Sequence, residues 1–214
     1  MPTSQGRNAK GELRDVAVGS QNEQIFGSQY GAWYGQTAAG NVYSMTTIPA
    51  GLAIPIETTV TPLVMLWNPS DSGKNAVLIN FTLTQNSGTA IVGSVGLVLR
   101  TNTGSTAATG ANVAAFANNV YNTNTFGGLL GGPNRSVVRA SSQGTNTIVA
   151  GVFAYPLFHI GALVTTTQII PPQVIKYEFN GELVLAPGNA VFVGGSAAQT
   201  ALFNQSISWA EVPV

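Results

Sequence analysis

The sequence contains no cysteine and a single histidine, His159. Without cysteine, neither a disulfide nor a thiolate metal site can form. A metal site built from two or three histidines and a carboxylate is excluded as well, because only one histidine is present. His159 lies within an apolar run, and we interpret it as a structural residue rather than a ligand or a base. We therefore expect no metal and no cofactor.

Charged residues are also scarce. They make up 7% of the 214 residues, and eight basic residues balance eight acidic ones, whereas a typical globular protein has ~25%. Arg7, Lys10 and Arg14 alternate with Glu12 and Asp15, so the basic cluster that binds nucleic acid is absent and no nucleic-acid partner is expected. A neutral chain tends to associate, and few lysines remain to guard sheet edges. We infer that partners in a permanent assembly cover these edges.

No segment indicates export or a membrane span. Residues 1–6 contain no apolar stretch, so a secretory signal is not expected. The most apolar run, residues 149–164, is shorter than the ~18 residues that suggest a membrane span, and it contains Pro156. We interpret this run as two buried strands joined by a tight turn, and we expect no membrane partner.

The chain does have enough apolar residues, 44%, to build a core. From Met45 onward, short apolar segments alternate with Gly, Pro or Asn, which predicts an all-β fold, a sandwich or barrel rather than alternating β and α units. The expected strands are residues 44–48, 58–67, 76–85, 90–101, 136–141, 147–153, 157–164, 174–179, 181–185, 190–193 and 206–211.

Turn chemistry organises this prediction. Residues 63–81 read as strand, polar turn and strand, a β-hairpin whose turn is built from Asn, Pro, Asp and Gly. After the turn, alternation predicts two faces: Val77, Ile79 and Phe81 on one, and Leu78, Asn80 and Thr82 on the other. Asn180-Gly181 predicts a second, two-residue hairpin. Pro187-Gly188 predicts a type II turn between late strands, a pattern that recurs in jelly-roll sandwiches.

We predict two parts, an extended N-terminal arm at 1–45 and a β-sandwich at 46–214. The sandwich carries a long loop insertion at 102–134, expected at one end of the sandwich and in contact with a neighbour or a ligand. Within it, residues 111–120 are compatible with one or two helical turns capped by Asn112.

Aromatic residues in an irregular segment, such as the arm, can anchor in a neighbour's pockets, and the alternative is an arm lying on its own domain. The predicted partner-binding residues are Phe26, Tyr30, Trp33 and Tyr34 in the arm, with Tyr121 and Phe126 as possible loop contacts.

No catalytic group of residues emerges, and we predict that the protein is not an enzyme. A Ser-His-Asp triad would need His159 with an aspartate, but Asp15 lies in the arm and Asp71 in the polar turn, and no nucleophile elbow is present. Glu178 and Glu182 flank Asn180-Gly181 and could face each other across that turn, with Lys176 near enough to pair with one. The carboxylates available for glycoside cleavage are Glu57, Glu178, Glu182 and Glu211, and we interpret the two at the turn, Glu178 and Glu182, as solvated residues.

Two segments resemble virion structural proteins of tailed bacteriophages, of the head decoration or cement type. They are residues 66–75, LWNPSDSGKN, and the ending 206–214, SISWAEVPV, which follows the Pro187-Gly188 turn. The resemblance implies a jelly-roll-like antiparallel β-sandwich that forms a homotrimer on the capsid surface, with the major capsid protein as partner. It also implies synthesis in the host cytoplasm and a final location in the virion. The arm and the 102–134 insertion match no family.

An alternative is a host-receptor (glycan)-binding β-sandwich of a head fibre or tail spike. Trp33, Tyr34, Tyr121 and Phe126 lie near expected loops, and an Asn- and Thr-rich surface can hydrogen-bond sugar hydroxyls. A pilin- or surface-layer-like subunit is a third alternative. The host, the position on the virion and the subunit count stay open from sequence.

Overall fold

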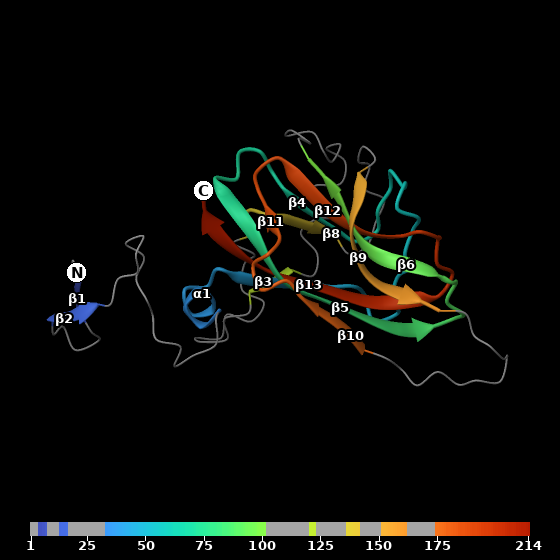
Figure 1. Ribbon diagram of the computed structural model, residues 1–214, viewed down its shortest axis with the longest axis horizontal. Coiled ribbons are helices and arrows are strands. Elements are labelled where there is room, and N and C mark those ends of the chain that lie inside the picture. Colours follow the sequence, from blue (N-terminus) through green and yellow to red (C-terminus); the bar gives the residue numbers. More distant parts are fainter. Residues whose placement is uncertain are drawn as a thin grey trace. The chain divides into compact units, whose positions relative to one another are not determined.

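The computed structural model describes residues 4–7, 13–16, 33–101, 120–122, 136–141, 151–161 and 174–214 (Figure 1). The chain divides into two units, Met1–Gly35 and Gln36–Val214. The first unit contains a small antiparallel sheet of β1 (Ser4–Arg7) and β2 (Leu13–Val16). A short helix, α1 (Tyr34–Ala38), spans the division, and the sequence had predicted the arm to extend to residue 45.

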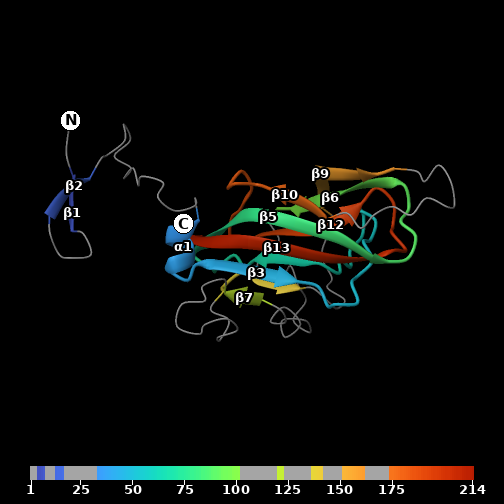
Figure 2. The ribbon, with the colours of Figure 1, turned by 90° about the horizontal axis from the view of Figure 1, so that it is seen from below.

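The second unit is an antiparallel β-sandwich, which confirms the predicted all-β sandwich class; the jelly-roll topology stays a prediction. In the described part, the larger sheet has the order β10-β5-β13-β3-β7 (Figure 2), with β11 also paired to β5, and the smaller has the order β8-β4-β12-β6-β9. The larger sheet comprises β3 (Val42–Thr46), β5 (Lys74–Ser87), β7 (Val120–Asn122), β10 (Val174–Glu178), β11 (Val184–Leu185) and β13 (Leu202–Pro213). The smaller comprises β4 (Met65–Asn68), β6 (Gly93–Arg100), β8 (Arg139–Ser141), β9 (Val152–Ile160) and β12 (Asn189–Gly195).

Strand alternation builds the core between the two sheets. In β13 every second residue is buried from Phe203 to Trp209, and these side chains belong to the main apolar cluster with Leu97 and Val191 of the smaller sheet, except for the polar Gln205. A second buried cluster involves the smaller sheet alone: Met65, Trp67, Val98, Ala190 and Phe192. The smaller sheet is therefore apolar on both faces, which explains its unbroken apolar runs.

A β-bulge in β5 overturns the predicted alternation. Ser208 lies opposite Asn80 and Trp209 opposite Leu78, so Ile79 is an extra residue in its strand. Leu78 and Phe81 are both buried, while Val77 and Ile79 are only half-buried. The prediction that Val77, Ile79 and Phe81 share one face was wrong, because an inserted residue shifts the two-residue period by one position.

The polar turn at residues 68–74 was also misassigned as a hairpin loop. It leads from β4 in the smaller sheet to β5 in the larger, so the two strands do not pair. The Asn68 amide nitrogen donates to the carbonyl oxygens of Lys74 (2.7 Å) and Leu185 (2.8 Å), and Gly73 has φ +64°. The turn chemistry was predicted correctly, but local residues do not determine which sheet each flanking strand joins.

The Asn180-Gly181 turn is confirmed, but the hairpin is not. Asn180 and Gly181 have φ of 49° and 89°, and Glu182 N–H donates to Phe179 O at 2.8 Å. However, β10 and β11, on either side of this turn, both pair with β5, one after the other. The predicted type II turn agrees with φ +81° at Gly188 and an Asn189 N–H to Ala186 O bond of 3.2 Å.

The prediction of two buried strands in the apolar run at 149–164 does not hold for residues 151–161, the part that the structure describes. This part forms one strand, β9, at the end of the smaller sheet, with exposed residues alternating with half-buried ones. His159 is exposed, and its Nδ1 lies 3.3 Å from Ser94 Oγ. The long expected strand at 58–67 is reduced to β4. The helical turns predicted at 111–120 fall outside the described residues except for Val120, which begins β7.

Candidate functional site

The structure locates three of the predicted partner-binding residues. Trp33 is half-buried and Tyr34 is 45% exposed, the two being adjacent at the start of α1. Tyr121 belongs to β7, where it lies opposite Ser44 of β3 at the end of the larger sheet. Phe26, Tyr30 and Phe126 lie outside the described residues.

The four candidate carboxylates have different surroundings. Glu178 and Glu182 are exposed near the Asn180-Gly181 turn. As expected, the carboxylate of Glu178 forms an ion pair with the ammonium group of Lys176, at 2.6 Å. Glu57 is half-buried. Glu211, in contrast, is 1% exposed. Among the residues that the structure describes, no three His, Asp or Glu side chains gather as metal ligands.

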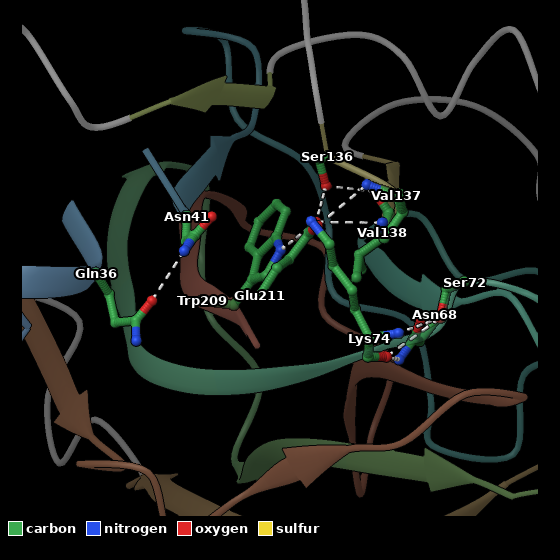
Figure 3. Close-up of polar contacts among 10 residues, drawn as sticks. All are labelled: Gln36, Asn41, Asn68, Ser72, Lys74, Ser136, Val137, Val138, Trp209 and Glu211. Carbon is green, nitrogen blue, oxygen red and sulfur yellow. Dashed lines mark hydrogen bonds and ion pairs between the residues drawn. The ribbon is translucent and has the colours of Figure 1, made fainter. Parts of the chain in front are cut away.

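The carboxylate of Glu211 is the centre of a buried polar cluster (Figure 3). Its Oε1 accepts hydrogen bonds from the hydroxyl of Ser136 and from Val138 N–H at 3.2 Å. Trp209 Nε1 lies 3.4 Å from the same oxygen. Oε2 accepts from Val137 N–H at 3.2 Å and lies 3.4 Å from the ammonium of Lys74. Backbone, hydroxyl and ammonium donors together compensate the burial of this charge.

This cluster joins three parts of the chain. Glu211 comes from β13, Lys74 from the start of β5, and residues 136–138 lead into β8 at the end of the smaller sheet. Because donors surround both oxygens, the carboxylate has little capacity left to accept hydrogen bonds from a substrate. We interpret it as a set of hydrogen bonds that stabilises the packing of the two sheets. A lone acidic residue two positions after Trp209, on the same side of an apolar strand, was the available sequence signal.

A different kind of site lies on the side of the sandwich where β9 and β10 are the edge strands of the two sheets (Figure 2). Phe179 is buried there between Tyr155 of β9 and Tyr177 of β10, with ring centroids 6.4 Å and 4.9 Å away. Both tyrosines are half-buried against the core. This aromatic cluster closes the core between the two edge strands.

The two edges differ in regularity. β9 contains Pro156 and two register shifts against β6, so its outer edge is interrupted. Proline and bulges are both devices that prevent an edge from pairing with another strand. β10 pairs with β5 in an unbroken register and carries Lys176 and Glu178. From the scarcity of charge, the sequence predicted sheet edges with little protection against pairing. On β9 this protection comes from Pro156 and the bulges instead of charge.

Together, these observations define an antiparallel β-sandwich with one buried carboxylate that is surrounded by donors, and with exposed sheet edges and loops. No family model matches the chain, and neither a curated protein nor a solved structure matches it. Among the described residues, no helix is both long and apolar enough to cross a membrane.

Proposed function

We propose that the protein is a structural component of a bacteriophage virion, a capsid cement or decoration protein. In this role it binds the outer capsid surface and stabilises the shell across capsomer seams. The observation that carries the proposal is the division of a weakly charged chain into a β-sandwich and a small N-terminal unit. The two four-residue strands β1 and β2 cannot bury a core of their own. A surface on a partner would supply the missing contacts.

The partner in this proposal is the major capsid protein, with further contacts between copies in a homotrimer. Phe26, Tyr30, Trp33 and Tyr34 would seat in pockets of a neighbouring subunit, as aromatic anchors commonly do. At about 25 cal/mol per Å² of apolar surface, a standard interface of roughly 1,600 Å² gives a large gross stabilisation, less the cost of ordering both partners. Repetition over the shell multiplies each contribution. No catalysis and no cofactor are part of this role.

Removal of residues 1–35 tests the proposal. The truncated chain is expected to keep its sandwich fold and to lose at least tenfold in affinity for capsids that lack the protein, measured by co-sedimentation. A full-length chain with Phe26, Tyr30, Trp33 and Tyr34 changed to alanine is the matched variant, and it should lose affinity in the same direction. Because few charges are available, full-length binding should change little between low and moderate salt. Undiminished capsid binding by the truncated chain would contradict the role of the arm.

The alternative is a glycan-binding module of a head fibre or tail spike. The specific observation in its favour is the 45% exposure of Tyr34, since exposed aromatic rings stack on sugars. A glycan array with the full-length protein separates the two functions. Binding of a defined glycan that is abolished by Tyr34→Ala or Tyr121→Ala would favour receptor recognition over cement.

A further inference from the structure

The outer edge of β10 has the regular geometry that a further strand needs. Phe179 N–H donates to Ile79 O at 2.8 Å, so the backbone of residue 179 points toward β5. Backbone groups alternate in direction along a strand, and the unbroken register therefore turns Ile175 and Tyr177 toward β5 as well. The N–H and C=O groups of Val174, Lys176 and Glu178 point away from β5. Among the described residues, no strand pairs with that side of β10.

The side chains of the same three residues are exposed on the outer face of the sheet. Val174 is 67% exposed, and the side chains of Lys176 and Glu178 are 52% and 54% exposed. Ile175 and Tyr177 pack against the core. The edge thus presents one cation and one anion, two residues apart, with backbone groups that point away from β5 at the same positions.

We propose that two copies of this chain pair edge to edge through β10, antiparallel and related by a two-fold axis at Tyr177. In this register Lys176 lies opposite Glu178 of the second copy, and the reverse pair forms on the other side of the axis. Both positions have outward-pointing backbone groups, so each opposed pair exchanges both of its backbone hydrogen bonds. Opposite charges directly across two strands stabilise the pairing.

Charge selects this register among those that the backbone allows. An axis at Lys176 would place two lysines opposite each other, and an axis at Glu178 would oppose two glutamates, both of which are destabilising. An axis at Ile175 would oppose Val174 to Lys176 and leave Glu178 without a cation from the second copy. The axis at Tyr177 is thus the one register within β10 that pairs opposite charges, and it makes the edge self-complementary, as a two-fold interface requires.

The β9 edge, with Pro156 and its register shifts, does not offer a comparable template. The β10 contact is short, since only residues 176–178 of each copy overlap within the strand. It belongs with small, weak interfaces rather than with permanent ones. The β10 pairing goes beyond the proposed capsid role and does not rest on it. Refuting one of the two proposals would therefore leave the other intact.

Charge reversal tests the pairing in solution with the full-length chain. Sedimentation equilibrium is expected to show a weak, concentration-dependent doubling in mass of the species that is present at low concentration. Lys176→Glu alone and Glu178→Lys alone should each weaken it at least tenfold, because each places like charges opposite one another. An equimolar mixture of the two variants should form heterodimers with affinity within a few-fold of the original protein. Asp71→Lys, at an exposed turn position, is the control for the change in net charge and should leave dimerisation unchanged.

Cysteine cross-linking tests the register. Because the chain has no native cysteine, only the introduced thiols can form a disulfide. Hydrogen-bonded residues across antiparallel strands have Cα atoms about 5.5 Å apart, within disulfide range. Under mild oxidation, a mixture of Lys176→Cys and Glu178→Cys chains should cross-link, while neither variant should do so alone. Cross-linking of either variant alone would overturn the register. A protein whose mass does not rise with concentration, and which forms no cross-link, would overturn the pairing. Lys176 and Glu178 would then be residues that prevent edge pairing.

Discussion

Glu211 and Gln205 are both buried polar residues of β13, yet their surroundings are opposite. The carboxylate of Glu211 is surrounded by donors from Ser136, Val137, Val138 and Lys74. Gln205 is 2% exposed, and neither atom of its side-chain amide has a hydrogen-bond partner among the described residues. A buried polar group stabilises a fold only when it is paired, so the two residues should respond differently to substitution.

Glu211→Gln should lower the free energy of unfolding by about 2–4 kcal/mol, since it removes the charge and turns an amide N–H toward backbone donors. The measurement is urea denaturation of the full-length chain. Glu178→Gln, which affects an exposed pair, is the matched control and should change stability by less than about 0.5 kcal/mol. Equal effects of the two substitutions would contradict the structural role of the Glu211 cluster.

Gln205→Met should stabilise the protein by about 1–2 kcal/mol, because a side chain of similar size replaces an unpaired buried amide. Gln199 provides the contrast, since it is also buried but bonds both the N–H and the C=O of Ile91. Gln199→Met should therefore destabilise by about 1–3 kcal/mol. Thermal unfolding of the two variants side by side decides the question, and destabilisation by both would refute the assignment of Gln205 as unpaired.

At the scale of elements, close backbone approach fixes how β9 lies on β6. A Cβ atom added to Gly96 would overlap the Tyr155 carbonyl oxygen and come within 2.8 Å of Pro156 Cα. Both obstacles are backbone atoms next to the register shifts of β9, so they cannot rotate away. Glycine is therefore required at this point of the sheet, as is common beside bulges.

Gly96→Ala should cost about 3 kcal/mol in unfolding free energy, since β9 must move away to make room. Gly161, just beyond the end of β9, has no atom within 4 Å of an added Cβ. Gly161→Ala should change stability by less than about 1 kcal/mol, with a small gain expected. Chemical denaturation of both variants provides the comparison. A Gly96→Ala variant as stable as the original would show that β9 and β6 do not approach this closely.

Sequence patterns predicted the turn residues of this fold but not the pairing partner of each strand. Turn residues at Asn180, Gly181 and Gly188 were predicted correctly because positive φ depends on the residue itself. The partner of each strand was not, because β4 and β5 belong to different sheets while β10 and β11 share one neighbour. The bulge at Ile79 has no local signal either, since its position depends on the register with β13.

At the scale of the whole molecule, the division at Gly35 separates a small sheet from a sandwich with its own core. The described core residues all belong to the second unit. A chain lacking residues 1–35 should therefore unfold in one cooperative transition within about 2 °C of the full-length protein, a shift below that expected for 1 kcal/mol. Differential scanning calorimetry measures this directly. A much lower midpoint for the truncated chain would show that the first unit contributes to the stability of the sandwich.

The sequence by itself determined the fold class, the low charge and the turn positions, because strand periodicity, composition and backbone φ preferences are local properties. It named Glu211 only as one of four carboxylates and gave no sign of its burial. Only the tertiary structure decided which strands pair, where β5 changes its buried face and which donors surround Glu211. Those outcomes depend on contacts between residues far apart in the chain, such as Glu211 with Ser136 and Lys74, and no local pattern encodes them.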